Sequence, residues 1–476
     1  MSIAFLTLKR YTPEKIMKIY NTMSRQKEDF VPITPGKVRL YACGPTVYNY
    51  FHIGNARAFL FFDVVRRYFQ FRGFEVTYVQ NITDIDDKII AQAIEESRDF
   101  AEVASLYTTA FLEDSAALGI GKPDFQPKAT DFVAEIIQLI IQLEQNGFAY
   151  EVNGDVYFDT QTMPSYGSLS GKKTEEQLAG ARVLENVNKR HPADFTLWKA
   201  AKPGEPEWES PWGKGRPGWH SECVVMSRQL LGETFDIHGG GIDLIFPHHE
   251  NELAQAMALT GKPLANYWMH NGFLNIEGEK MSKSLKNFFT ARDILSQYEA
   301  EVIRFFFLSK HYRSPIDFDR ELIEESNRAL RNLHSAFADW DIADLEGMDP
   351  EPEALAAFNT AMDDDFNSAK AIALFFDLAH KAKNKQNPEG IRKSAAATLY
   401  TLGKVLGFFQ NLKAKRDGQL NKLSGALIEL VLGYRKQARE NKDWALSDKI
   451  RDDLAAIGIE IKDTKEGCLW HLKEQS

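Results

Sequence analysis

The feature that most constrains the fold is a strand, a helix and a second strand that follow one another between positions 38 and 80. Residues 38–43 are apolar, with β-branched and aromatic members, which predicts a buried strand. Residues 55–72 carry apolar side chains at helical spacing, Gly73 lies where a helix C-cap is expected, and 75–80 predicts a strand. Strands joined through a helix pair in parallel, so we expect a doubly wound, Rossmann-like α/β sheet.

The same alternation resumes after a long interval. Helix, strand, helix and strand are predicted at residues 221–231, 234–238, 247–259 and 267–274. The residues between these two patterns do not show the alternation. They predict helices at 97–125 and 130–147, a strand at 155–158, and a loop rich in Pro, Gly and Trp at 202–218. We interpret residues 125–215 as an insertion between two halves of one nucleotide-binding catalytic domain.

These patterns divide the chain into successive segments. We expect an N-terminal extension at 1–16, the first catalytic half at 17–124, the insertion at 125–215 and the second catalytic half at 216–288. An α-helical bundle at 289–413 and a small α+β module at 425–476 are expected to follow. Met17 is an alternative start, and the polar, basic residues 414–424 predict a linker. In the last module the apolar faces of two helices are expected at Leu427, Val431, Tyr434 and Ala438, and at Leu446, Ile450, Leu454 and Ile457.

Composition excludes several classes of protein. No run of ~18 apolar residues or signal peptide is present, which predicts a cytoplasmic protein without a membrane span. Three cysteines in 476 residues argue against a disulfide framework, and we interpret Cys468 as structural. A net charge of −10 argues against indiscriminate nucleic-acid binding but leaves room for a local RNA site.

Two short motifs predict a nucleotide site. His52 and Asn55 flank a glycine at the start of the first helix, where free N–H groups and the helix dipole favour a phosphate. Lys280 and Lys283 belong to a KMSKS segment after the last strand, and suit the β- and γ-phosphates of ATP. Taken alone, the first motif could be ordinary capping and the second a solvated basic loop. Together they resemble the paired signature motifs of class I aminoacyl-tRNA synthetases, and no P-loop motif competes with them.

A third constellation predicts a metal. His248 and Glu252 are four residues apart on a predicted helix and so share one face. Cys223 precedes them, and Cys43 ends the first strand, so a doubly wound sheet would bring all four to one crevice. Two thiolates, an imidazole and a carboxylate form a plausible tetrahedral zinc set. The alternatives are a surface His–Glu pair and buried, inert cysteines.

Longer strings identify the resemblance more closely. Residues 41–48 (YACGPTVY), 81–88 (NITDIDDK), 218–223 (GWHSEC) and 246–252 (FPHHENE) resemble motifs of the cysteinyl-tRNA synthetase family, and the likeness extends over nearly the whole chain from Met17. Asn55 departs from the class, which most often has histidine there. A role that needs a protonated imidazole at this position is therefore in doubt, whereas ATP binding should survive.

The resemblance implies an activity. It implies a cysteine–tRNA ligase that forms cysteinyl-AMP from L-cysteine and ATP with Mg²⁺, then loads the tRNA for cysteine. One zinc ion on Cys43, Cys223, His248 and Glu252 would separate cysteine from serine, which a hydrophobic pocket does only by ~10²-fold. No editing domain is then needed, and the insertion is expected to contact the acceptor end of the tRNA.

The remaining site residues follow from the same resemblance. Thr83 and Trp219 would line the amino-acid pocket, Gly239, Gly240 and Gly241 would let adenine and ribose approach bare backbone, and Asp243 would meet the ribose hydroxyls unless it is a solvated carboxylate. The last module would read the anticodon with Arg439, Asp448 and Asp463, for which solvated surface charges are the alternative. We expect a monomer.

Two other functions are considered. A ligase that joins cysteine to an amino-sugar shares this type of catalytic domain, but would have no use for the module after residue 425. A catalytically silent RNA-binding relative would have no need to keep the lysines and the four candidate metal ligands.

Overall fold

The computed structural model describes residues 16–171, 188–276, 279–280, 289–410, 412–464 and 467–472. The chain forms two compact units, Met1–Phe409 and Gln410–Ser476. Of the expected N-terminal extension, only Ile16 lies within the described residues. In the described part of the chain, no helix combines the length and apolar character needed to cross a bilayer.

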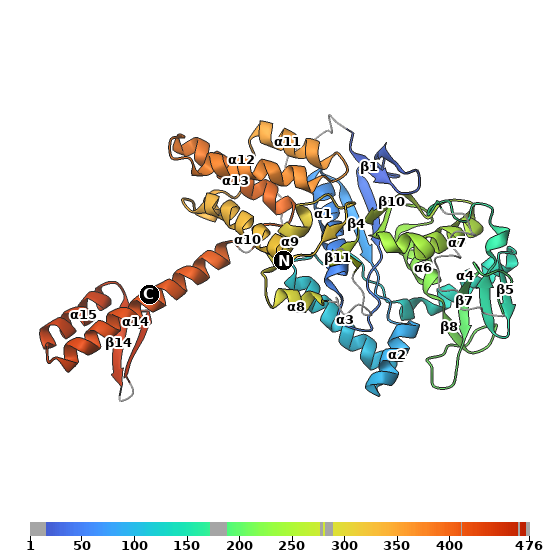
Figure 1. Ribbon diagram of the computed structural model, residues 1–476, viewed down its shortest axis with the longest axis horizontal. Helices are drawn as coiled ribbons and strands as arrows, with labels where there is room; N and C mark the ends of the chain where they lie inside the picture. Colours follow the sequence, from blue (N-terminus) through green and yellow to red (C-terminus); the bar gives the residue numbers. More distant parts are fainter. Residues whose placement is uncertain are drawn as a thin grey trace. The chain divides into compact units, whose positions relative to one another are not determined.

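Four parallel strands form the central sheet of the first unit, in the order β10-β9-β3-β4 (Figure 1). Their bounds are Lys37–Ala42 for β3, Glu75–Gln80 for β4, Phe235–Gly241 for β9 and Ala265–Asn271 for β10. The interior strands β3 and β9 are mostly buried, as sheets covered on both faces require. The expected parallel α/β sheet is confirmed.

Helices cover both faces of this sheet. Helix α1 (Ile53–Phe71) joins β3 to β4, α6 (Trp219–Leu231) precedes β9, and α7 (Glu250–Thr260) joins β9 to β10. Figure 1 shows α1 on one side of the sheet and α6 and α7 on the other. The order of connection reverses between β3 and β9, and ligands bind where such a reversal opens a crevice at the carboxyl ends of the strands.

One expected boundary is wrong. We expected a helix at 247–259, but α7 begins at Glu250, because Ile245–His249 forms a wide turn in which Phe246 is extended. This turn changes the direction in which His248 and His249 face.

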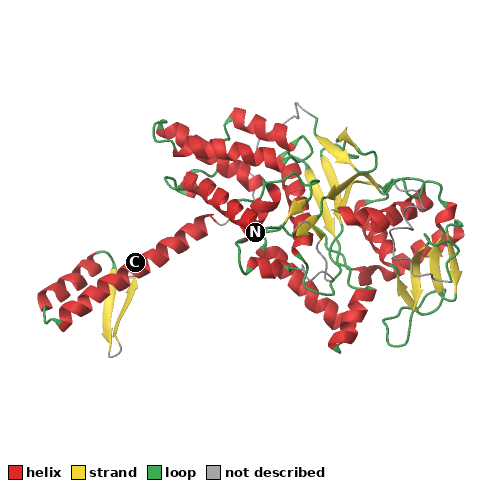
Figure 2. Ribbon diagram, viewed as in Figure 1, coloured by secondary structure: helices red, strands yellow, loops and turns green. Residues whose placement is uncertain are grey.

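Between β4 and α6 the chain forms a helical part and then a separate sheet (Figure 2). Helices α2 (Asp87–Glu96) and α3 (Phe100–Ala117) precede the expected insertion at 125–215, and α4 (Val133–Gln145) lies within it. An antiparallel sheet of β5 (Ala149–Val152), β6 (Asp155–Phe158), β7 (Phe195–Ala200) and β8 (Gly215–Pro217) follows. Sequence reasoning missed α2, and it assigned β8 to a loop.

Two further small sheets flank the central one. Strands β1 (Lys18–Asn21) and β2 (Gln26–Asp29) form a hairpin. Strand β11 (Leu274–Ile276) pairs with β12 (Glu279–Lys280) on one side and with β13 (Ile316–Asp317) on the other.

The bundle comprises α8 (Ala291–Leu295), α9 (Ala300–Leu308), α10 (Arg320–His334), α11 (Pro352–Met362), α12 (Ser368–Lys383) and α13 (Glu389–Val405). A buried ion cluster joins it to the sheet. Asp63 of α1 lies 2.9 Å from both Arg67 of α1 and Arg304 of α9, and accepts from the Gly121 N–H at 3.0 Å. Burial acts to raise the pKa of Asp63, but the two guanidinium groups outweigh it and lower that pKa.

Three consecutive aspartates in the turn between α11 and α12 fasten the bundle to separate parts of the first unit. The Tyr68 hydroxyl donates to Asp363 at 2.6 Å, and Lys27 pairs with Asp364 at 2.6 Å. Asp365 accepts from the Tyr312 hydroxyl at 2.7 Å, from Arg313 Nε at 2.8 Å and from the Tyr20 N–H at 2.9 Å.

The second unit has helices α14 (Leu412–Glu440) and α15 (Trp444–Ala456) and a hairpin of β14 (Ile459–Thr464) and β15 (Gly467–Leu472). The expected linker at 414–424 is part of α14. The predicted core face of α14 is confirmed only in part. Ala438 is buried and Val431 packs against the core as expected, but Leu427 and Tyr434 are exposed. Ile428 and Leu432 are buried in their place, because the hairpin packs on the face one residue further along the helix. In α15 Leu454 is buried as expected, but Leu446 and the following Ile457 are exposed, since the hairpin covers only one side.

Candidate active site

The structure brings the four predicted metal ligands together. Cys43 directly follows β3, Cys223 lies in α6, His248 lies in the turn before α7, and Glu252 lies in α7. All four are buried, and one ligand atom of each lies within 4.8 Å of the others. We call these four residues the Cys–His–Glu cluster. It lies at the carboxyl ends of the strands, where the order of connection reverses between β3 and β9.

Individual distances show how closely the donors approach. The two sulfurs of Cys43 and Cys223 lie 3.9 Å apart, and Cys223 Sγ lies 3.6 Å from His248 Nε2. Glu252 Oε1 lies 2.8 Å from His248 Nε2 and 3.9 Å from Cys43 Sγ. Tetrahedral zinc ligands at ~2.0–2.3 Å from the ion lie ~3.3–3.8 Å apart, so small side-chain shifts suffice to admit an ion.

Two histidines that sequence reasoning missed complete a second, overlapping group. Cys43, His238, His249 and Glu252 also place one ligand atom each within 4.8 Å of one another. His249 Nε2 lies 3.2 Å from Cys43 Sγ, and His238 Nε2 lies 2.5 Å from Glu252 Oε2. The Cys43 thiol and the Glu252 carboxylate are therefore shared between two sets of imidazoles.

Further polar groups hold the imidazoles from behind. His249 Nδ1 meets His270 Nε2 at 2.8 Å, and His270 Nδ1 meets the Thr22 hydroxyl at 2.7 Å. His220 Nδ1 lies 3.0 Å from His248 Nδ1, which leaves His248 Nε2 directed at Cys223 and Glu252. Such outer contacts fix the orientation of metal-binding imidazoles.

The electrostatics of the cluster separate its two thiols. Burial raises the pKa of Cys43 well above its usual value, whereas hydrogen bonding with Cys43 lowers the pKa of Cys223 to about 6. Burial acts to lower the pKa of His248, but the Glu252 carboxylate and Cys223 outweigh it and raise that pKa to about 10. Burial lowers the pKa of His270 to about 3 and holds that of His249 far below its usual range, so both stay neutral.

A sequence signal for the missed histidines existed. Five of the eleven histidines lie between positions 220 and 270, namely His220, His238, His248, His249 and His270. That density marks one shared environment, but it does not say which ring nitrogen faces the thiols.

The predicted amino-acid pocket residues lie around this cluster. The Trp219 indole stacks on His248 with ring centroids 4.0 Å apart. The Thr83 hydroxyl donates to Glu222 Oε2 at 3.0 Å and accepts from Asn81 Nδ2 at 3.1 Å. Glu222 was missed by sequence reasoning; burial raises its pKa well above the usual value.

The first nucleotide motif lies at the N-terminus of α1, and the chain that follows the second returns to the same place. His52 is the N-cap of α1 and its Nδ1 accepts from the Asn55 N–H at 3.2 Å. The Ile53 N–H donates to the Phe289 carbonyl at 3.0 Å, so the chain that follows the KMSKS segment returns to this point. Lys280 ends β12, whereas Lys283 lies outside the described residues.

The three glycines end β9, and internal packing already explains two of them. A Cβ at Gly239 would lie 2.1 Å from the Phe62 ring of α1, and one at Gly240 would lie 2.8 Å from Leu244 and 3.1 Å from His249. Their lack of side chains therefore lets α1, Leu244 and His249 approach the sheet. Asp243 is exposed in the turn after Gly241, and both residues stay predictions for ribose and adenine.

The predicted anticodon residues lie in the second unit. Arg439 and Asp448 are exposed, on α14 and α15, and Asp448 pairs with Arg451 at 3.2 Å. Asp463 lies in β14, and its side chain is outside the described part of the structure. Cys468 of β15 packs against the core of this unit and accepts from Arg435 at 3.8 Å.

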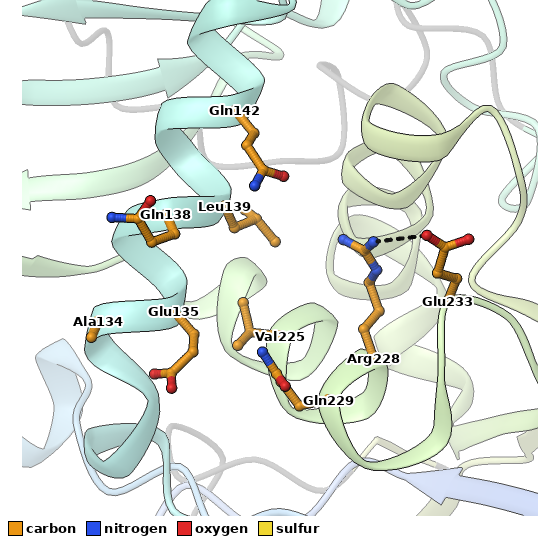
Figure 3. Close-up of a pocket in the computed structure, with 9 residues that line it drawn as sticks. All are labelled: Ala134, Glu135, Gln138, Leu139, Gln142, Val225, Arg228, Gln229 and Glu233. Carbon is orange, nitrogen blue, oxygen red and sulfur yellow. Dashed lines mark ion pairs between the residues drawn. The ribbon is translucent and has the colours of Figure 1, made fainter.

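A separate groove of about 520 Å³ lies between α4 and α6 (Figure 3). Six of its nine lining residues are polar or charged, and Arg228 pairs with Glu233 at 3.9 Å on the α6 side. None of the Cys–His–Glu cluster lines it, although Cys223 and Val225 share α6.

Comparison with known proteins identifies the family. The family described as tRNA synthetases class I (C) catalytic domain matches residues 29–328, and the DALR domain matches 357–410. A cysteine–tRNA ligase of Desulfitobacterium hafniense is 50% identical over 476 residues, which cover 96% of this chain and 100% of that protein. The chain belongs to the cysteine–tRNA ligase family. A relative with the same name from Geobacter sulfurreducens is 48% identical, again over 96% of this chain and 100% of the relative.

Solved structures agree at the level of fold. Mycobacterium tuberculosis methionyl-tRNA synthetase in complex with methionyl-adenylate gives a TM-score of 0.56 at 15% identity, over 78% of this chain and 89% of that one. A leucyl-tRNA synthetase ternary complex from Agrobacterium radiobacter K84 gives 0.58 at 11% identity, over 81% and 87%. The cysteine–tRNA ligase family member described here is thus an aminoacyl-tRNA ligase with a class I catalytic fold.

Proposed function

We propose that this enzyme activates L-cysteine with ATP, selects it through one zinc ion in the Cys–His–Glu cluster, and transfers the cysteinyl group to the 3′-terminal ribose of the tRNA for cysteine. The observation that carries the proposal is the convergence of Cys43, Cys223, His248 and Glu252 from four separate elements. Burying two thiols, an imidazole and a carboxylate together is costly in free energy, and a bound metal ion would offset that cost.

The donor set fits zinc. Soft thiolates with an imidazole and a carboxylate suit this ion, and the outer histidines supply the second layer of hydrogen bonds that zinc ligands commonly have. Zinc strongly prefers a thiolate to a neutral hydroxyl, which is the difference between cysteine and serine. Trp219 then covers one face of the cluster and limits the access of water, and Thr83 offers an oxygen close to it.

Activation is a substitution at the α-phosphorus of ATP. The cysteine carboxylate attacks, cysteinyl-AMP forms, and pyrophosphate leaves, so catalysis consists mostly of positioning and charge stabilisation. We assign His52 and Asn55 to the phosphates at the N-terminus of α1, and Lys280 and Lys283 to the β- and γ-phosphates. Asp243 and the glycines Gly239, Gly240 and Gly241 are assigned to the nucleoside, and Mg²⁺ to the phosphates and water.

The tRNA is assigned to two regions. The inserted helices and sheet would hold the acceptor end, and Arg439, Asp448 and Asp463 would contact the anticodon. Whole-length likeness to cysteine–tRNA ligases supports a tRNA acceptor over an amino-sugar. A monomer is proposed, and light scattering of the purified protein tests it.

Cysteine-dependent exchange of pyrophosphate into ATP tests the proposal directly. Exchange is expected with cysteine, to fall by at least ~10²-fold with serine, and to be lost after metal removal and regained with zinc. Charging of cysteine tRNA should follow the same pattern. Exchange that is equally fast with serine, or unaffected by complete metal removal, would overturn the selection mechanism.

A further inference from the structure

Arg57 is a buried cation whose partners, among the described residues, are all backbone carbonyls. It lies in α1, is 2% exposed, and has no carboxylate within ion-pair distance among the residues that the structure describes. Burial lowers the pKa of its guanidinium to about 10. Its two terminal nitrogens donate at 2.5–3.4 Å to the carbonyls of Gly272, Phe273, His311, Tyr312 and Ser314. A buried charge without a counter-ion is costly, so its presence calls for a reason.

The five carbonyls belong to two segments that enter one small sheet. Gly272 and Phe273 lead from β10 into β11, and residues 311–314 lead into β13. Strand β11 pairs with both β13 and β12, and Asn275 of β11 lies opposite Lys280 of β12. The Arg57 guanidinium therefore binds the two segments that lead into β11 and β13, and β11 in turn pairs with β12, which carries Lys280.

The same arginine belongs to the helix that carries the other predicted ATP-binding motif, at the N-terminus of α1. It lies in the second turn of α1, five positions after the N-cap His52, on a helix whose next residues are buried. A planar group with five N–H donors can bind several carbonyls from two segments at once, which the three donors of a lysine cannot match. No contact of Arg57 reaches solvent, so it acts through the backbone and not on a substrate.

We propose that Arg57 is a positioning residue that sets the Lys280 strand against the N-terminus of α1, and thereby the register of the two ATP-binding motifs. This inference rests on the proposed role of Lys280 in binding the phosphates. It assigns to Arg57 an effect on ATP, and none on the Cys–His–Glu cluster.

The test is Arg57→Lys in the full-length enzyme, measured by pyrophosphate exchange. We expect KM for ATP to rise about 10-fold, since small misplacements of positioning groups cost up to ~10²-fold, while KM for cysteine and zinc content stay within about 2-fold. The control is Arg66→Lys on the same helix, where the arginine binds the Lys122 carbonyl and Asp124, and it should leave both KM values unchanged. Equal changes in the KM for ATP and for cysteine, or no change in either, would overturn the proposal.

A double variant separates this inference from the proposed function. Lys280→Ala alone should raise KM for ATP; if it does not, the assigned role of Lys280 fails, and the proposed route through Arg57 fails with it. If Lys280→Ala acts as expected, Arg57→Lys should add less than about 2-fold in that background, because both changes act on one contact. If the effects of the two substitutions on KM for ATP were fully additive, the positioning role of Arg57 would be rejected, while the assigned role of Lys280 would stand. Should Arg57→Lys not fold, Arg57→Gln, with two neutral donors, replaces it in both measurements.

Discussion

The indole of Trp219 lies flat against the imidazole of His248, with centroids 4.0 Å apart and planes 17° from parallel. Trp219 begins α6 and is half-buried, whereas His248 is fully buried. Because His220 holds the other nitrogen of His248, the stack leaves that imidazole a single orientation toward Cys223. The tryptophan thus orients a candidate metal ligand.

Removing this stack should weaken metal binding. Trp219→Ala is expected to lower zinc affinity ~10–100-fold, the range typical of lost outer contacts, whereas Trp219→Phe keeps a flat ring and should lose less. Competition with a chromophoric chelator measures both. Trp444→Ala, an exposed tryptophan of the second unit, is the control. Unchanged affinity in Trp219→Ala would show that the stack has no orienting role.

The thiol of Cys223 should determine metal content and amino-acid choice together. Cys223→Ser replaces a soft ligand by a neutral hydroxyl, so zinc content and the preference for cysteine over serine should fall in parallel. Elemental analysis and pyrophosphate exchange measure the two. Cys468→Ser, in the second unit, should change neither. Full zinc content in Cys223→Ser would rule Cys223 out as a ligand.

Zinc binding should release about two protons near pH 8. Without metal, His248, whose pKa is raised to about 10, and Cys43, whose pKa is raised further by burial, carry protons, while Cys223, at about 6, is already ionised. Ligation requires both thiolates and a neutral imidazole, so affinity rises with pH, by ~100-fold per pH unit as long as the pH stays below both pKa values. Calorimetry in buffers of different ionisation enthalpy counts the protons. In His248→Gln, zinc binding should release one proton fewer. The same number of protons released by the variant and the unchanged protein would contradict the assignment of His248 as a ligand that loses a proton.

The buried ion cluster at Asp63 should dominate the stability of the first unit. Asp63→Asn leaves Arg67 and Arg304 without their carboxylate, at a cost of about 3–5 kcal/mol. Because the folded pKa of Asp63 is lowered, its contribution is present above the ordinary carboxyl pKa and is lost as pH falls through the folded value. Urea unfolding followed at several pH values measures this. The exposed pair Asp452–Arg451 provides the control Asp452→Asn, expected to cost less than ~1 kcal/mol.

Changes at the predicted anticodon residues should affect tRNA alone. Arg439→Gln is expected to raise KM for tRNA in charging assays about 10-fold while leaving pyrophosphate exchange intact, since a lost charged contact to a base costs ~1–3 kcal/mol. Lys442→Gln, an exposed change just beyond α14, serves as the matched control. An equal effect of both variants would mean that Arg439 contributes only general charge.

The sequence predicts the sheet because two pairs of short strands, β3–β4 and β9–β10, are each joined by a single helix with apolar residues at helical spacing. It also predicts that Cys43, Cys223, His248 and Glu252 meet, since parallel strands place their carboxyl ends at one edge. Their roles, and those of the nucleotide and anticodon residues, stay predictions. The family resemblance is confirmed by the matches over nearly the whole chain.

The parts that sequence reasoning missed depend on contacts between distant residues. His249 adjoins Cys43 only because the turn Ile245–His249 departs from regular helix, which no periodicity reveals. The displaced face of α14 has a similar origin, because apolar residues occur on two sides of the helix and the hairpin selects one. Arg57 resembles any charged residue of a helix until the carbonyls around it are known.

The three successive aspartates after α11 place a strict limit on chain length at that turn. Each neighbour in sequence serves a different anchor: Asp363 meets Tyr68, Asp364 meets Lys27 and Asp365 meets Tyr312. Ordinary surface loops accept insertions and deletions. Here, a residue added or removed between Asp363 and Asp365 would move at least one carboxylate away from its partner, so the spacing of the three anchors fixes the length of this turn.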